Sequence, residues 1–336
     1  MTSRCVIAYA ALTSVALLSA CTGSTPTNPA SLPSTVQAHV SASLPANAGH
    51  ITGWIEPTAL SEVHGDKQRL YISDVPSGLG ARGFVNVYVH REHASALRLI
   101  GNISGLDSPT QIAVDRFENV YVIQADNGAP VLVFKRDAIQ PFRTLNTEGK
   151  LPFSIGVATD GTVYVGTVPG LILVYAPGSN TPTTTLQTRG DGPNQLFLDR
   201  DGNLYYEAVF FGGTGGVISR FAHGSTTSVT FNFPDSPIRA ALLHDGDMAI
   251  EPLSVDRIDR FERGNTTTIE NSFSIPFAQS FCLNQAESEL YTVGAGTITT
   301  FAFPEGRSQN SLLIGGPNDA NFGCASSPAR HLPRPF

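Results

Sequence analysis

The most constraining feature of this sequence is a pattern that recurs six times between Leu70 and Phe301. Each copy has an apolar run, which carries a tyrosine in all copies but one, then a break rich in Gly, Asn and Asp, then a second apolar run ending on an aromatic residue. The first anchors are Tyr71, Tyr121, Tyr164, Tyr205, Ala249 and Tyr291, and the second are Tyr88, Phe134, Tyr175, Phe221, Phe261 and Phe301. Spacings of 40 to 50 residues are too long for leucine-rich or ankyrin repeats and match a unit of four short strands.

One copy can be followed strand by strand. Its four runs are Thr110–Asp115, Val120–Gln124, Val131–Lys135 and Phe142–Leu145. Later copies keep turn residues that tolerate the positive φ of tight hairpins, at Asp160-Gly161, Asp201-Gly202-Asn203 and Asp245-Gly246. Four antiparallel strands joined by hairpins make one blade of a β-propeller. We therefore predict an all-β fold, a six-bladed β-propeller of four-stranded antiparallel blades.

The two ends of the array are incomplete in a complementary way. The first unit has strands near Leu70–Ser73, Val85–His90 and Leu97–Ile100 but no obvious inner strand upstream. A matching inner strand stands alone at the other end, around Asn318–Ala325. We predict that this C-terminal strand completes the first blade and closes the ring, which leaves only protected outer edges. The segment His50–Val63, which contains the only tryptophan, is not placed by the pattern.

The repeat also resembles a known family. It reads Pro-x-x-Ile-x-Val-Asp, a turn, Val/Leu-Tyr-Val, and later Val-x-Val-Phe/Tyr, with the best copy at Pro109–Phe134 and with Asp115 and Tyr121 in place. This resembles the NHL-type six-bladed β-propellers over roughly residues 66–327. The resemblance extends weakly to lactonase-like relatives that hold a metal in the central channel. It implies an architecture more than one activity, because propellers carry many functions.

The N-terminus resembles a bacterial lipoprotein signal. A single Arg4 precedes the apolar stretch Val6–Ala20, which is too short to span a bilayer. Leu18-Ser19-Ala20-Cys21 resembles the lipobox, which implies cleavage before Cys21 and lipidation of its thiol. The alternative is ordinary secretion with cleavage after Ala20. Thr22 is not the aspartate that often retains lipoproteins at the inner membrane, so an outer-membrane destination is favoured in a Gram-negative source.

These signals divide the chain into four parts. Residues 1–20 are predicted to be the signal peptide, 21–47 a disordered tether of Ser, Thr, Pro and Ala, 48–327 the propeller, and 328–336 a C-terminal tail. We expect a monomer in the cell envelope, lipid-anchored to the outer membrane or cell surface and facing the periplasm or the exterior.

Charge and motifs exclude several classes of function. The chain has 21 basic and 28 acidic residues, and removing residues 1–20 leaves 20 against 28, a net charge of −8. A nucleic-acid partner needs clustered Lys and Arg, so none is expected. The eight histidines are scattered without a metal-ligand spacing, and neither a nucleophile elbow nor a phosphate-binding loop occurs. We predict no cofactor.

A recurring proline marks the start of each inner strand, and the residue two places later should face the central channel. In one copy this residue is Ala278, and we take the adjacent Gln279 in its place. The predicted polar ring is then Gln111, Ser154, Gln195, Arg239, Gln279 and Asp319. The ring is either a small-ligand site at the channel mouth or a wetted surface that binds only water.

Two function classes remain open. One is a binding or scaffolding module for a protein or a small ligand. The alternative, which the resemblance implies, is a lactonase-like hydrolase with a divalent metal in the channel. No glutamate occurs on the inner strands; Asp115 and Asp199 are interpreted as turn residues, and Glu207 and Glu251 lie on second strands. No catalytic or metal-ligating residue is therefore assigned.

Two cysteines remain in the predicted propeller, Cys282 and Cys324. They occupy about the same place on the last two inner strands, which ring closure makes neighbours. In an oxidising periplasm they would form a disulfide across the seam. Adjacent inner strands often lie too far apart for this, however, and two separate buried thiols are the alternative.

Overall fold

The computed structural model describes residues 51–55, 68–76, 81–90, 97–126, 128–190, 192–209, 216–276, 278–284, 286–294, 296–314 and 323–327. The chain divides into two units, Met1–Ser43 and Leu44–Phe336, and the described residues all belong to the second. The predicted signal peptide, Cys21, the tether, Asp319 and the tail 328–336 lie outside them. No helix with the length and hydropathy of a membrane span occurs in the described ranges.

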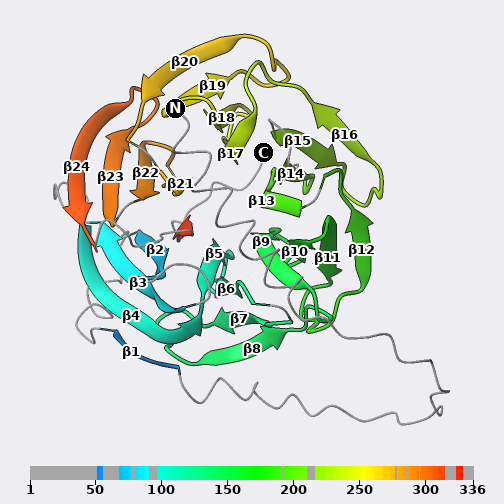
Figure 1. The fold of residues 1–336 in the computed structure, drawn as a ribbon, viewed down its shortest axis with the longest axis vertical. Helices are drawn as coiled ribbons and strands as arrows, with labels where there is room; N and C mark the ends of the chain where they lie inside the picture. The colour runs from blue at the N-terminus through cyan, green and yellow to red at the C-terminus, as the bar shows by residue number, and fades with distance from the viewer. Residues whose placement is uncertain are drawn as a thin grey trace, which may run out of the picture. The chain divides into compact units, whose positions relative to one another are not determined.

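Six antiparallel sheets stand side by side around a ring, as predicted (Figure 1). Blade 2 is β5 (Pro109–Val114), β6 (Val120–Gln124), β7 (Val131–Phe134) and β8 (Pro141–Leu145). Blade 3 is β9 (Leu151–Val157), β10 (Val163–Val168), β11 (Leu171–Tyr175) and β12 (Thr184–Gln187). Blade 4 is β13 (Gly192–Leu198), β14 (Leu204–Val209), β15 (Gly216–Phe221) and β16 (Ser228–Phe231).

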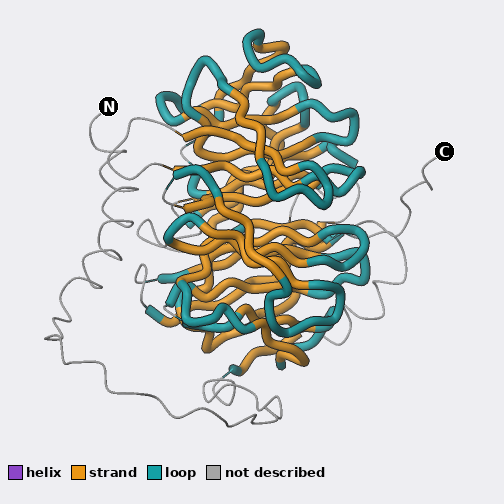
Figure 2. The backbone as a smooth tube through the Cα atoms, turned by 90° about the vertical axis from the view of Figure 1, so that its right-hand side faces the viewer, coloured by secondary structure: helices purple, strands orange, loops and turns teal. Residues whose placement is uncertain are grey.

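The remaining blades follow the same plan. Blade 5 is β17 (Pro237–Leu242), β18 (Met248–Pro252), β19 (Arg257–Phe261) and β20 (Ile269–Ser274). Blade 6 is β21 (Ser280–Leu283), β22 (Glu289–Gly294), β23 (Thr297–Ala302) and β24 (Arg307–Leu313). Blade 1 is β25 (Cys324–Ser326), β2 (Arg69–Asp74), β3 (Arg82–His90) and β4 (Leu97–Asp107), with β1 (Thr52–Ile55) outside β4. Seen from the side, the described part consists of strands and loops (Figure 2).

The C-terminal strand closes the ring, which confirms the prediction. β25 pairs antiparallel with β2, with Tyr71 opposite Ala325 and Ile72 opposite Cys324. The last described strand of the chain is therefore the inner strand of the first blade. In the structure Cys282 of β21 and Cys324 of β25 form a disulfide, with their Cα atoms 5.6 Å apart. That separation lies in the range that disulfides require.

The segment that the repeat pattern did not place forms a fifth strand. β1 pairs antiparallel with β4, with Trp54 opposite Asn102. It covers the outer edge of blade 1, which would otherwise present unpaired backbone groups to solvent. Trp54 itself stays 46% exposed.

The hydrophobic core lies between neighbouring blades. The cluster between blades 2 and 3 combines Tyr121 and Ile123 of β6 with Val163 and Val165 of β10 and Tyr175 of β11, all at most 3% exposed. Burying one such side chain contributes roughly 2 kcal/mol. Because each blade buries its two flanks only against its neighbours, the ring is the unit that is stable.

Candidate functional site

The predicted channel ring makes contacts between blades. Ser154 Oγ donates to the carbonyl of Pro193 at 2.6 Å, and Gln195 Oε1 accepts from the backbone N–H of Ala240 at 2.8 Å. Arg239 Nε donates to the carbonyl of Gln279 at 2.8 Å. Each of these three side chains thus bonds the backbone of the next blade. A ligand-binding role for the six-residue ring stays a prediction.

The aspartates of the repeat organise turns, in line with their interpretation from sequence. Asp115 Oδ1 accepts from the backbone N–H of Phe117 and Asn119, and its Oδ2 accepts from the Asn119 amide and the Tyr121 hydroxyl. Asp199 makes the same four bonds two blades further on, with Tyr205 as the tyrosine. Both carboxylates are therefore fully occupied by their own turns.

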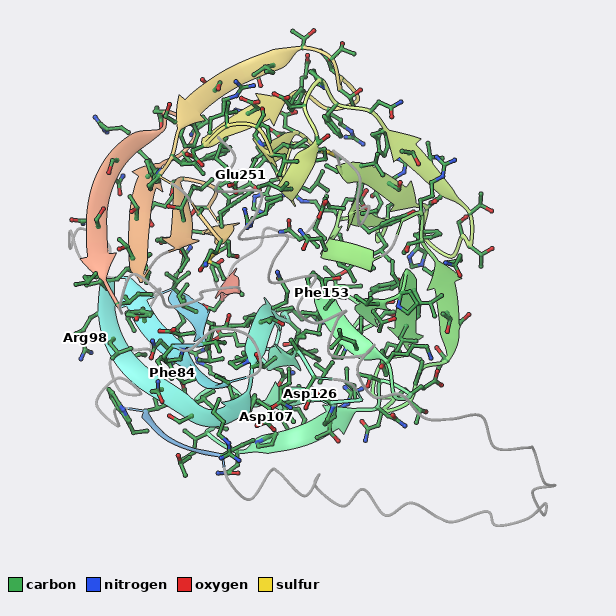
Figure 3. The ribbon with its side chains drawn as sticks, in the orientation of Figure 1. Phe84, Arg98, Asp107, Asp126, Phe153 and Glu251 are labelled. Carbon is green, nitrogen blue, oxygen red and sulfur yellow. A yellow bond between two sulfur atoms is a disulfide. The ribbon has the colours of Figure 1, made fainter. Side chains whose placement is uncertain are left out.

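Two glutamates whose burial the sequence did not settle lie deep in the structure at equivalent positions of blades 4 and 5. Glu207 of β14 is fully buried and Glu251 of β18 is 2% exposed. Figure 3 shows Glu251 in the inner part of its blade. Their cross-strand neighbours differ: Glu251 faces Arg239, which binds its Oε2 at 3.0 Å, whereas Glu207 faces Gln195. Only Glu251 of the two therefore has a cation as its cross-strand neighbour on the inner strand.

Without such a partner, Glu207 is held in its neutral form. Burial raises the pKa of Glu207 to about 8, and the Asn194 amide and the Arg239 guanidinium oppose this only in part. Asn194 Nδ2 donates instead to the carbonyl of Ile238, and neither Glu207 oxygen accepts a hydrogen bond from a described group. Gly216 leaves the space for this carboxyl, since a Cβ there would lie 2.6 Å from Glu207 Oε1.

Glu207→Gln is expected to remove a pH-dependent loss of stability. The folded-state pKa of about 8 lies above the ordinary 4.5, so the folded protein keeps a proton that the unfolded chain releases. The stabilisation that the bound proton gives the folded state is fully present below pH 4.5 and is lost as the pH rises through 8. One pKa unit is worth about 1.4 kcal/mol, so this group should lower the wild-type free energy of unfolding by about 3 kcal/mol between pH 5 and pH 8. Urea unfolding across that range measures it.

The matched control is Glu305→Gln, which makes the same chemical change at an exposed position of the β23–β24 turn. It should leave the pH dependence of the wild type unchanged. Burial also raises the pKa of Glu251 and brings that of Glu287 to about 7, so some pH dependence remains in both variants. Parallel pH profiles for the wild type and Glu207→Gln would contradict the neutral, buried state of Glu207.

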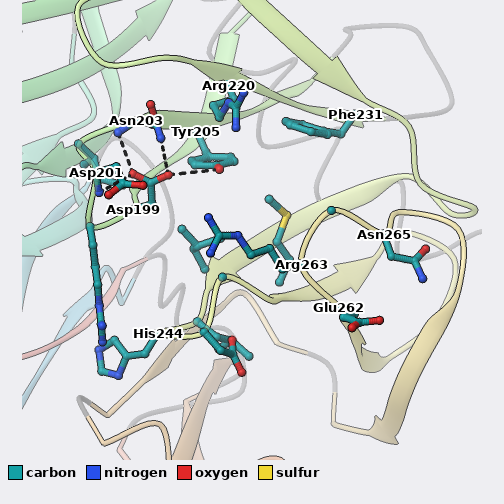
Figure 4. Close-up of a pocket in the computed structure, with 18 of the residues that line it drawn as sticks. Asp199, Asp201, Asn203, Tyr205, Arg220, Phe231, His244, Glu262, Arg263 and Asn265 are labelled. Carbon is teal, nitrogen blue, oxygen red and sulfur yellow. Dashed lines mark hydrogen bonds between the residues drawn. The ribbon is translucent and has the colours of Figure 1, made fainter. Parts of the chain in front are cut away.

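A separate cavity of about 470 Å³ lies between blades 4 and 5. It is built from the first turns of both blades, from the β19–β20 turn and from strand residues that face between them (Figure 4). Leu198, Tyr205, Phe231, Leu242 and Met248 supply an apolar and aromatic wall, and Arg200, Arg220, Arg263, Asp201 and Glu262 supply charge. None of these residues belongs to the predicted channel ring.

Some charged groups around this pocket have partners within the protein, and others form no ion pair with a described residue. Asp199 is occupied by its turn, and Asp245 binds Arg260 at 2.8 Å. Burial, and then the nearby Arg200, lower the pKa of His244, so its imidazole is neutral at pH 7. Arg200, Arg220 and Arg263 form no ion pair within the described part of the chain. The pocket therefore presents three guanidinium groups outside ion pairs, alongside the carboxylates of Asp199, Asp201, Asp245 and Glu262.

No family model matches this sequence, and no curated protein matches it. Among solved structures, the chain is similar to the β-propeller domain of Cps50 (Swd1) from Myceliophteria thermophila, at 11% identity and a TM-score of 0.49, over 61% of this chain and 71% of that one. It is also similar to hydrazine synthase of Kuenenia stuttgartiensis, at 14% identity and a TM-score of 0.48, over 60% and 64%. The six-bladed fold rests on the sheets themselves.

Proposed function

We propose that this protein is an exported binding module, anchored in the cell envelope through Cys21, that takes a small ligand in the pocket between blades 4 and 5. The observation that carries the proposal is the pocket. Its volume of about 470 Å³ lies within the range of small-molecule sites, roughly 300 to 1,000 Å³. An apolar wall with a few charged groups is also typical of such sites, where the polar groups fix the orientation of the ligand.

The surrounding structure supports this proposal. The pocket is formed mainly by turns that rigid strands hold in place, which is where proteins commonly position binding residues. The hydrolase alternative has no comparable support. Among the described residues no three potential metal ligands lie together, and Asp319 is outside that set. A metal site in the channel stays a prediction from the resemblance.

Filling the pocket is expected to abolish small-ligand binding. Thr266 lines the pocket on the β19–β20 turn, and Thr266→Trp adds a large ring there. Saturation-transfer NMR with phenylacetate and phenylacetamide as probes should give ligand signals for the wild type that are reduced at least severalfold in the variant. Thr268→Trp, at an exposed position two residues further along and outside the pocket lining, is the matched control and should bind as the wild type does.

Equal signals for Thr266→Trp and the wild type would place any binding elsewhere on the surface and overturn the assignment. A circular-dichroism melt of both variants shows that each keeps the fold. Since both substitutions lie on the same turn, a difference in ligand signal between the two variants reports on the pocket and not on the stability of the turn.

A further inference from the structure

The pocket between blades 4 and 5 has an aromatic wall. The Tyr205 and Phe231 rings lie 6.3 Å apart between centroids at an interplanar angle of 20°, and Tyr205 also stacks on Phe197 at 5.4 Å. Leu242 and Met248 extend this wall on the side of blade 5. Such a surface suits the apolar or aromatic body of a ligand and offers it few hydrogen bonds.

Arg220 lies beside this wall with unused binding capacity. It is half-buried, and its Cζ lies 5.9 Å from the centroid of the Phe231 ring. Its Nε atom is buried and has no hydrogen-bond acceptor among the described residues. Arg220 also acts on the Tyr205 hydroxyl, but a guanidinium carries five donors in a fixed planar fork, so others stay available to a ligand.

The next blade shows what this position normally binds. Arg220 stands opposite the anchor Tyr205, and Arg260 stands opposite the equivalent anchor Ala249. Arg260 is surrounded by carboxylates: Asp245 at 2.8 Å, Asp247 at 2.7 Å and Glu270 at 3.2 Å.

Blade 4 keeps one carboxylate of that shell, Asp201 at the position of Asp245, but Asp201 forms no ion pair with Arg220. In its first turn the residue that corresponds to Asp247 is Asn203, whose amide is committed to Asp199. Opposite Arg220 on the outer strand is Val229, whereas Arg260 has Asn271 opposite it and Glu270 beside that residue in a bulge. Arg220 thus has the place of Arg260, while Asn203 replaces one carboxylate of its shell and no described carboxylate forms an ion pair with Arg220.

A second cation reaches the same cavity. Arg263 packs across Gly246. A Cβ at position 246 would lie 2.8 Å from Arg263 Cδ, and φ at Gly246 is +93°, so both the space and the backbone conformation require a glycine. In Figure 4 the Arg263 side chain extends into the pocket. It forms no ion pair with a described residue.

From these observations we infer that the pocket selects ligands in which a carboxylate is attached to an apolar or aromatic body. The ligand carboxylate takes the place that Asp247 occupies around Arg260, and it binds Arg220, with Arg263 closing over it. The body lies on Tyr205 and Phe231. Arginine and carboxylate form paired, charge-assisted hydrogen bonds, which supply the selectivity. This inference rests on the proposed function of the same pocket.

The test compares phenylacetate with phenylacetamide, which share a shape and differ in charge. Affinities are measured by saturation-transfer titration at low ionic strength. The wild type should bind phenylacetate about tenfold more tightly, the size expected for a hydrogen bond to a charged group. Arg220→Gln should remove this preference and leave the affinity for phenylacetamide unchanged. Arg263→Gln, at an exposed position that needs no repacking, should weaken phenylacetate binding severalfold.

Arg307→Gln on blade 6, exposed and outside the pocket, is the matched control and should keep the wild-type preference. Equal affinities of the wild type for the acid and the amide, with binding still sensitive to Thr266→Trp, would overturn the ligand class and leave the proposed function standing. Binding of neither probe would overturn both. An acid preference that survives both Arg220→Gln and Arg263→Gln would also overturn the inference.

Discussion

A chain that ends at Pro317 is expected to aggregate and to lose cooperative unfolding. This truncation removes β25, the inner strand of blade 1, and leaves β2 as an open edge. Every residue of Arg69–Asp74 is buried in the closed ring, so the cut exposes a buried strand, Leu70–Ile72 included, with unpaired backbone groups. Edges of this kind pair with other chains.

The bonds lost with β25 explain the size of the effect. Besides the pairing with β2, Ser73 N–H donates to the carbonyl of Gly323 at 3.0 Å and Ser327 N–H to that of Arg69 at 2.8 Å. Ser326 Oγ donates to the carbonyl of Leu283 at 2.7 Å, which ties β25 to blade 6. At about 1 kcal/mol for each net hydrogen bond, and with the apolar contacts added, the loss approaches the 5 to 15 kcal/mol that typically stabilise a domain.

Light scattering after size exclusion, together with a thermal melt, measures the outcome. A chain ending at Ser327 keeps β25 and lacks only the tail, so it is the matched control and should behave as the full-length protein does. A soluble, monomeric protein that melts cooperatively after truncation at Pro317 would show that blade 1 does not need its inner strand.

The second large effect is expected from the disulfide. Replacing both Cys282 and Cys324 with alanine should lower the free energy of unfolding by about 4 kcal/mol, because the bond closes a loop across 42 residues and restricts the unfolded chain. The bond also joins the inner strands of blades 6 and 1, so its loss should loosen the seam. Urea unfolding of the oxidised wild type and the double variant measures the difference.

Reduction of the wild type with dithiothreitol should reproduce the effect of the double variant, and the same reductant should leave the variant unchanged. This pair of controls separates the loss of the bond from the loss of two partly buried side chains. Equal urea midpoints for the oxidised wild type and the double variant would contradict a stabilising closure of the ring.

Much of the fold could be predicted because one pattern repeats. The strand predicted at Val120–Gln124 has the same bounds as β6, and the unmatched strand near Asn318–Ala325 correctly indicated ring closure. β1 could not be found in this way, because it lies outside the repeat and is held by pairing with β4, more than 40 residues away in the sequence. A four-residue strand has too little pattern of its own to indicate its partner.

Whether the predicted ring residues face the channel stays a prediction, because their orientation depends on more than their spacing from the prolines. Counting two places from each proline assumes strict alternation along the inner strand. The register shifts between Pro193 and Gln195 and between Pro237 and Arg239, and such a bulge redirects the side chains that follow it. Gln195 and Arg239 accordingly bond the neighbouring blade.

The pocket between blades 4 and 5 was missed for a different reason. Its charged residues lie on several turns and strands, and each of these, taken alone, has the sequence of an ordinary repeat element. The available signal was a comparison between copies. Arg220 and Arg260 each precede the second anchor of their blade, but Asn203 stands in blade 4 where Asp247 stands in blade 5. An arginine that keeps its place while its acidic partner changes indicates a different binding partner.

Non-reducing peptide mapping of the protein purified from an oxidising compartment tests the closed six-bladed ring most directly. Trypsin should release Gly264–Arg307, which contains Cys282, covalently joined to Ser308–Arg330, which contains Cys324, and the two should separate only after reduction. This result would place the C-terminal strand beside the inner strand of blade 6, where blade 1 requires it. Recovery of both peptides as separate alkylated thiols would mean that the two strands are not neighbours and that the ring is not closed as described.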